Sequence, residues 1–236
     1  MAAVDDLIGD VERELASRGL ILRGGFAFEQ DEDAPAGPAG APALAALLVG
    51  QRGAEPWPHF QQWLQRQSGT VANPLDTWSR EIIASVARRF GARAVSPSDK
   101  PYLPFQQWAM RAEGLRPSPL GILMHPDYGL WHAYRGALLF DTQDAAAAIA
   151  GMNQHAHIPI HLCDRCDGKP CLKSCPVDAY DGRGFNYADC LSHVRSEQGR
   201  PCRDDGCLDR NACPYGLEWR YPADVQRFHM AAFASL

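Results

Sequence analysis

Hydrophobic residues along the first 140 positions recur with two different periods. Where they recur every three or four residues, as over 4–18, the pattern predicts an amphipathic helix. Where they form short runs or alternate with polar residues, as over 130–140, the pattern predicts a strand. Together these patterns predict helices over 4–18, 58–67, 73–89 and 104–114, and strands over 20–28, 43–50, 121–125 and 130–140.

The order of these elements predicts an α+β fold, because helices and strands interleave without the strict rhythm of a doubly wound sheet. No GxGxxG or GxxxxGK[ST] motif follows a predicted strand, so a Rossmann or P-loop site is not expected. The alanine-rich tract 144–151 is interpreted either as a short helix or as part of a linker. The composition changes sharply at Cys163, so we place a boundary near residue 155 and expect domains of 1–155 and 156–236, the second with a C-terminal tail.

Composition and charge restrict the class of protein. The chain has 236 residues, of which 46% are hydrophobic, and this is enough for a normal core. No apolar run approaches the length of a membrane span, and the acidic start lacks the features of an export signal. We therefore expect a cytoplasmic protein with no membrane partner. The net charge of −5 does not favour nucleic-acid binding.

All eight cysteines lie in the last third of the chain, in two halves that each end in a Cys-Pro step. A cytoplasmic compartment is reducing, so metal binding is favoured over a disulfide framework. Each 4Fe–4S cubane takes four thiolates, and eight cysteines in two halves therefore match two clusters that serve electron transfer. The predicted metal ligands are Cys163, Cys166, Cys171, Cys175, Cys190, Cys202, Cys207 and Cys213.

Zinc is the main alternative, because four thiolates also suit a tetrahedral zinc ion. Either two zinc sites or one cluster with one zinc would account for the cysteines, although zinc ribbons favour two C-x2-C knuckles and this chain has one. His155, His157 and His161 precede the first cysteine and could also be ligands. Because eight cysteines already complete two cubanes, we interpret these histidines as solvated residues of a linker.

The segment 117–140 carries the features of a ligand-binding element. Its glycines would allow a flat ligand or another backbone to approach closely, and its arginine can pair with a carboxylate, an amide carbonyl or a phosphate. Structural interpretations remain open, because a histidine before proline suits a turn and alternating aromatic residues are typical of buried strands. The candidate ligand-contacting residues are His125, Pro126, Gly129, Trp131, Arg135 and Gly136.

In this segment the chain resembles two protein families. The segment 117–140 resembles the strand–turn–strand of CblC-type cobalamin-processing proteins and the equivalent segment of epoxyqueuosine reductases, which also carry a C-terminal double-cubane ferredoxin. The stretches ALAALLVG, NPLDTW and PFQQWAMRAEG follow one another in CblC-like order, and the sequence around Cys190 resembles a segment between the cubane motifs of epoxyqueuosine reductases. Two features depart from the families: a CblC helix histidine is replaced near Ala109, and the aspartate-bearing catalytic segment of epoxyqueuosine reductases is not found.

The resemblance implies a nitroreductase-like domain followed by a bacterial-ferredoxin-like domain with two 4Fe–4S clusters. It implies an oxidoreductase that binds cobalamin with its lower base detached and passes single electrons from the clusters to cobalt, with a separate reductase as electron donor. In two-cluster ferredoxins the cysteine of each Cys-Pro step ligates the other cluster. Applied to this chain, the resemblance assigns Cys163, Cys166, Cys171 and Cys213 to the first cluster. It assigns Cys175, Cys190, Cys202 and Cys207 to the second cluster.

Two other functions remain open at this point. The chain could be an electron-transfer adaptor whose first domain is only a docking platform for a partner. It could also be a flavin-dependent reductase on the same scaffold, which would need a cluster of basic residues for the flavin phosphate. The candidates for that cluster are Arg88, Arg89 and Arg93, for which a solvated helix end is the simpler interpretation.

Overall fold

The structure is a computed structural model that describes residues 6–152, 160–181 and 184–235. The chain forms two compact units, and each unit combines two stretches of sequence. The first unit contains 1–114 and 133–158, and the second contains 115–132 and 159–236. The segment 115–132 therefore groups with the cysteine-rich part of the chain, whereas a boundary near residue 155 would assign it to the first domain.

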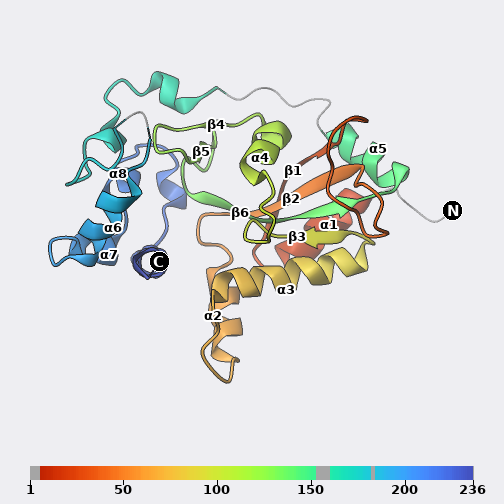
Figure 1. The fold of residues 1–236 in the computed structure, drawn as a ribbon, viewed down its shortest axis with the longest axis horizontal. Coiled ribbons are helices and arrows are strands. Elements are labelled where there is room, and N and C mark those ends of the chain that lie inside the picture. The colour runs from red at the N-terminus through yellow and green to blue at the C-terminus, as the bar shows by residue number, and fades with distance from the viewer. Residues whose placement is uncertain (1–5, 153–159, 182–183, 236) are drawn as a thin grey trace. The chain divides into compact units, whose positions relative to one another are not determined.

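A four-stranded sheet with the order β1-β2-β6-β3 forms the centre of the first unit (Figure 1). Strand β1 pairs antiparallel with β2, and β3 pairs antiparallel with β6. The α+β class predicted from the sequence is confirmed, and three of the four strands lie where the hydrophobic pattern predicts them. The strands are β1 (Ile21–Ala27), β2 (Ala45–Arg52), β3 (Arg93–Val95) and β6 (His132–Phe140).

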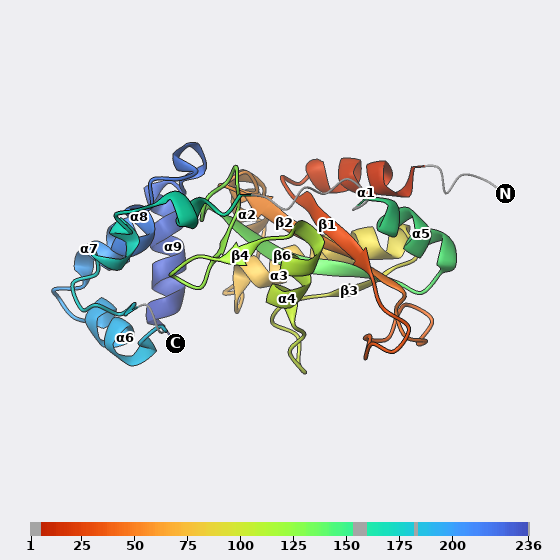
Figure 2. The ribbon, with the colours of Figure 1, turned by 90° about the horizontal axis from the view of Figure 1, so that it is seen from above.

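Amphipathic helices cover this sheet and bury its apolar residues (Figure 2). Helices α1, α4 and α5 pack against β1, and α3 packs against β3. Helix α3 buries residues at helical spacing, among them Trp78, Ile82 and Val86, and begins with a proline at its first turn. The alanine-rich tract forms a helix, as the first of its two interpretations predicts. The helices are α1 (Leu7–Ala16), α2 (Trp57–Gln65), α3 (Pro74–Arg89), α4 (Phe105–Glu113) and α5 (Gln143–Met152).

The second unit joins a short hairpin to the helices of the cysteine-rich region. Strand β5 (Leu123–Met124) pairs with β4 (Arg116–Pro117), and not with the strand that follows it in sequence. None of the helices in the described residues has the length and hydrophobicity that crossing a membrane requires. The helices of this unit are η1 (Leu162–Arg165), η2 (Pro170–Leu172), α6 (Tyr187–Arg195), α7 (Arg200–Asp205), α8 (Leu208–Asn211), η3 (Leu217–Trp219) and α9 (Ala223–Ala234).

The core of the second unit contains cysteines. Leu120, Met124 and Leu130, all from the segment 115–132, pack in one buried cluster with three cysteines. Burial of these apolar side chains is the main force that holds such a small unit together. The segment that precedes β6 therefore supplies much of the apolar covering of the cysteines Cys163, Cys171 and Cys213.

Candidate metal centre

Four cysteines form a first group in the second unit: Cys163, Cys166, Cys171 and Cys213. Burial, followed by the proximity of Cys213 and Cys171, raises the pKa of the Cys163 thiol to about 11. Burial also raises the pKa of Cys213, and Cys166 adds to the effect. The pKa values of Cys163 and Cys213 are thus each affected by other members of the same group, as expected of a shared site.

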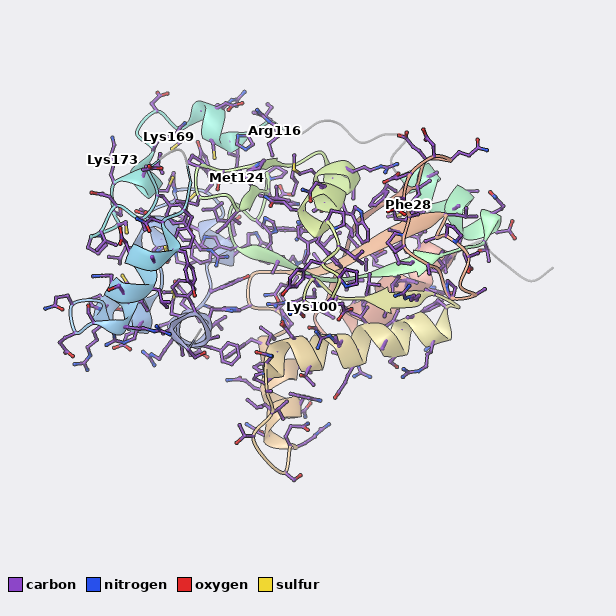
Figure 3. The ribbon with its side chains drawn as sticks, in the orientation of Figure 1. Phe28, Lys100, Arg116, Met124, Lys169 and Lys173 are labelled. Atoms are coloured by element: carbon purple, nitrogen blue, oxygen red, sulfur yellow. The ribbon has the colours of Figure 1, made fainter. Side chains whose placement is uncertain are left out.

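Neighbouring polar groups fix the backbone of this first group. The Lys169 ammonium, labelled in Figure 3, donates hydrogen bonds to the carbonyl oxygens of Cys163 and Cys166, the latter at 2.9 Å. Arg116 forms an ion pair with Asp164, which lies between the first two cysteines. The loop between Cys163 and Cys171 is thereby held in one conformation by charged hydrogen bonds.

The other four cysteines surround a cavity of about 270 Å³. Burial, followed by the proximity of Cys207 and Cys175, raises the pKa of Cys190 to about 11, and the same two thiols raise the pKa of Cys202. The second group therefore contains the last cysteine of the first motif. Apolar side chains form most of the remaining wall, among them Val177, Tyr180, Phe185, Val194, Met230 and Phe233.

Asp209 lies beside both groups of cysteines. Its side chain is 1% exposed, and its Oδ1 accepts a hydrogen bond from the backbone N–H of Ser174 at 3.0 Å. Burial raises the pKa of this carboxyl group. Its charge in turn raises the pKa of Cys171 in the first group and of Cys190 in the second. Asp209 therefore fixes the backbone at the point where the chain passes from one group to the other.

The distance between the thiols distinguishes what each group could hold. All eight cysteines are free of disulfide bonds. Within the described part of the chain, no group of three or more His, Cys, Asp or Glu side chains is arranged to hold a metal ion. Four thiolates on one zinc ion stand about 3.8 Å apart, because each Zn–S bond is about 2.3 Å. The four thiolates of a cubane bind four different iron atoms and stand further apart.

The structure describes one of the three histidines that precede the first cysteine. His155 and His157 lie outside the described residues. His161 differs from the expectation of a solvated linker residue, because only 9% of it is exposed. Its Nε2 lies 3.1 Å from the carbonyl oxygen of Arg116, and its Nδ1 lies 3.5 Å from Asp164. His161 therefore connects the segment 115–132 to the first cysteine loop.

The candidate residues of the turn 125–129 contact other parts of the second unit. The His125 Nδ1 accepts hydrogen bonds from the backbone N–H groups of Asp127 and Tyr128, and its ring stacks on Tyr128 at 3.9 Å. Pro126 is the residue between His125 and Asp127 in this turn. A Cβ atom on Gly129 would lie 2.4 Å from the carbonyl oxygen of Tyr215. The backbone of Tyr215 therefore occupies the space beside Gly129 in which a ligand could otherwise lie.

Trp131 is also engaged within the second unit. Its side chain is fully buried, and its ring packs edge-on against Tyr221 at 5.4 Å. The guanidinium of Arg210 lies over the Trp131 ring at 4.5 Å and donates a hydrogen bond to the carbonyl oxygen of Leu130 at 2.6 Å. Cation–π and aromatic contacts of this kind anchor the segment before β6 to the cysteine-rich helices.

Arg135 and Gly136 belong to the first unit, whereas the cysteines belong to the second. The Arg135 Nε donates to the Gln51 Oε1 at 2.7 Å, and the side chain lines a cavity of about 280 Å³. A Cβ atom on Gly136 would lie 2.7 Å from the carbonyl oxygen of Val95, so this glycine also accommodates protein atoms. The cavity beside Arg135 is further lined by Asp76, Pro97, Ser98, Tyr102 and Tyr134.

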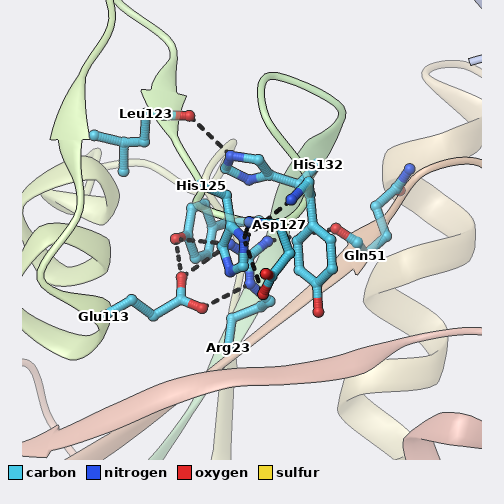
Figure 4. A network of polar contacts seen from close by, with 9 residues as sticks. Arg23, Gln51, Glu113, Leu123, His125, Asp127 and His132 are labelled. Atoms are coloured by element: carbon cyan, nitrogen blue, oxygen red, sulfur yellow. Dashed lines mark hydrogen bonds and ion pairs between the residues drawn. The ribbon is translucent and has the colours of Figure 1, made fainter. Parts of the chain in front are cut away.

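A buried ion pair supports one wall of that cavity. Arg23 is 1% exposed, and its guanidinium donates two hydrogen bonds of 2.9 Å to the carboxylate of Glu113 (Figure 4). The Tyr134 hydroxyl donates to the same carboxylate. Burial raises the pKa of Tyr134, so this hydroxyl keeps its proton and remains a donor. The sequence gives no signal for this network, because its members are 90 and 21 residues apart.

Two of the three arginines proposed for a flavin phosphate are engaged elsewhere. Arg89 forms an ion pair with Glu14 at 2.6 Å, and Arg93 donates to the carbonyl oxygen of Ala36 at 2.8 Å. Arg88 is in the last turn of α3. No protein-family model and no curated protein matches the chain.

Proposed function

We propose that this chain is an iron–sulfur protein that carries two 4Fe–4S clusters in its second unit and transfers electrons one at a time. The observation that supports this proposal is the division of the eight cysteines into two groups of four. The first group contains Cys213 from the second motif, and the second group contains Cys175 from the first motif. This exchange is what crossed ligation in two-cluster ferredoxins requires.

The roles of the surrounding residues follow from the chemistry of such a site. When bound, a 4Fe–4S cluster accepts and releases single electrons at a potential set by burial, charge and hydrogen bonds. Leu120, Met124 and Leu130 exclude water from the first group. Burial raises the pKa of Cys163 and of Cys190 to about 11, so iron binding has to displace the protons of these thiols, as metal binding to cysteine generally does. The cluster-binding region is therefore expected to take up iron with release of protons.

Metal content tests this proposal directly. After anaerobic purification or reconstitution, we expect about eight irons and eight sulfides per chain, since each cubane has four of each. Iron and acid-labile sulfide analysis, with electron paramagnetic resonance (EPR) of the dithionite-reduced protein, measures both quantities. A colourless protein with stoichiometric zinc and no labile sulfide would overturn the proposal.

The proposed electron acceptor is a corrinoid bound base-off by the first unit. The feature that favours it is Arg135, which lines a cavity beside Tyr102, a residue 70% exposed. Pockets for drug-sized ligands have volumes of about 300–1,000 Å³, and a corrinoid is larger than such ligands. The cavity of about 280 Å³ is too small for the whole corrinoid, so Arg135 and Tyr102 would hold only a part of it. Cobalt changes oxidation state in one-electron steps, which suits single-electron carriers.

Replacement of Arg135 tests this acceptor. In Arg135→Ala, we expect the affinity for cobalamin to fall about tenfold or more, because a charged hydrogen bond to the ligand is lost. The shift of the visible cobalamin bands toward the base-off form measures binding, and iron content should be unchanged. Arg89→Ala is the matched control, since this arginine of the same unit pairs with Glu14 away from the cavity. If the unaltered protein binds no corrinoid at micromolar concentration, the acceptor is wrong and an electron-transfer adaptor takes its place.

A further inference from the structure

A histidine that the sequence motifs do not include lies on the wall of the second cysteine cavity. His193 is on α6, one helical turn after Cys190, and lines the cavity together with all four cysteines of the second group. Its Nε2 atom is buried and has no hydrogen-bond partner among the described residues. Residues three apart on a helix share a face, so Cys190 and His193 face the same space.

A buried ring nitrogen without a partner is costly. Leaving such a group unsatisfied costs about 1–3 kcal/mol, so a partner for it is expected in the functional protein. Most of the cavity wall is apolar and offers no acceptor. Asp209 is the carboxylate on this wall. Its Oδ1 is engaged by Ser174 and its Oδ2 is buried without a partner, but in the described residues no hydrogen bond joins it to His193. The other acceptors on this wall that a histidine N–H can reach are the sulfur atoms of the four cysteines and of what they hold.

We propose, building on the proposed function, that the Nε2–H of His193 donates a hydrogen bond to a sulfur atom of the second 4Fe–4S cluster. The reduced cluster carries one more negative charge than the oxidised cluster, so a donor at its sulfur stabilises the reduced form more strongly. His193 therefore raises the reduction potential of the second cluster. It is a positioning and tuning residue, and it is not a ligand.

The test is a redox titration of the purified iron-loaded protein with dithionite, monitored by EPR. In His193→Leu, the ratio of reduced to oxidised second cluster at a fixed potential should fall about tenfold, the scale of one hydrogen bond to a charged group. A tenfold change corresponds to about 59 mV for a one-electron couple. In His193→Gln, whose amide can still donate, part of this shift should be recovered. His229→Phe is the matched control, because that histidine of the same unit stacks on Tyr221.

The outcomes separate this inference from the proposed function. If the unaltered protein lacks two clusters by iron and sulfide analysis, the proposed function itself fails. If two clusters are present and His193→Leu leaves the second potential unchanged, the function stands and the hydrogen bond is refuted. If His193→Leu loses the second cluster altogether, pulsed EPR of the unaltered protein with ¹⁵N-labelled histidine decides. A weak coupling of one histidine nitrogen to the reduced cluster supports the inference, and its absence refutes it.

Discussion

Cys175→Ala is expected to lose the second cluster and keep the first, although Cys175 belongs to the first cysteine motif. The reason is spatial: Cys175 lines the cavity of the second group, and its proximity raises the pKa of Cys190 and Cys202. Removing one of four thiolates leaves an iron without its ligand, so the whole cubane should be lost or become unstable. About four irons per chain should remain.

Cys171→Ala is the matched control, because Cys171 is only four residues earlier in the same motif. Its pKa is raised by burial and then by Cys213 and Cys166, members of the first group. This variant should therefore lose the first cluster and keep the second. Iron content and the EPR signals of the two reduced clusters distinguish these cases. Loss of the same cluster in both variants would show that the ligands follow the order of the sequence and are not crossed.

The secondary structure of the first unit could largely be predicted from the sequence, because its signals are local. Helix α3 follows from apolar residues at helical spacing, a proline at its start and a glycine after its end. The sequence also identifies Asn73 as the residue before the helix, but its side chain makes no capping hydrogen bond, because its backbone is left-handed with φ 45°. Strand β3 has no such local signal, since it has only three residues and pairs with a distant strand.

The partner of the segment 115–132 could not be predicted in the same way. Its alternating residues before and within β6 indicate strands, but nothing in them shows that Trp131 packs against Tyr221, 90 positions later. The sequence alone also left open whether Gly129 and Gly136 approach a ligand or a backbone. The structure decides this for both glycines, because protein carbonyl oxygens already lie next to them.

The cysteines could be found from sequence because their spacing is distinctive, whereas His193 and Asp209 could not. A histidine three residues after a cysteine on a helix is equally compatible with a solvated face. Its burial depends on the cavity wall that α9 completes with Met230 and Phe233, roughly a turn apart on that helix. The position of Asp209, two residues after Cys207, is equally uninformative in the sequence. Its burial beside the cysteines is seen only in the structure, where it accepts a hydrogen bond from Ser174.

Gly129→Ala is expected to destabilise the second unit, and this result would distinguish a structural role from a ligand-binding role. Gly129 has φ +57°, and an added Cβ would lie 2.4 Å from the Tyr215 carbonyl oxygen. The left-handed backbone costs an alanine about 1–2 kcal/mol, and displacing a packed backbone adds about 1–3 kcal/mol. The free energy of unfolding should therefore fall by about 2–5 kcal/mol. Since Tyr215 follows Cys213 by two residues, the first cluster should also be lost more readily.

Gly121→Ala provides the matched control for this prediction. Gly121 lies in the same segment with φ +74°, but an added Cβ would meet no atom within 4 Å. This variant should show only the backbone cost of about 1–2 kcal/mol, so the difference between the variants isolates the contact with Tyr215. Anaerobic denaturant unfolding with iron analysis measures both effects. If Gly129→Ala instead matched Gly121→Ala in stability and iron content but bound cobalamin more weakly, Gly129 would act at a ligand site, because the loss would then depend on the corrinoid and not on the protein's own packing.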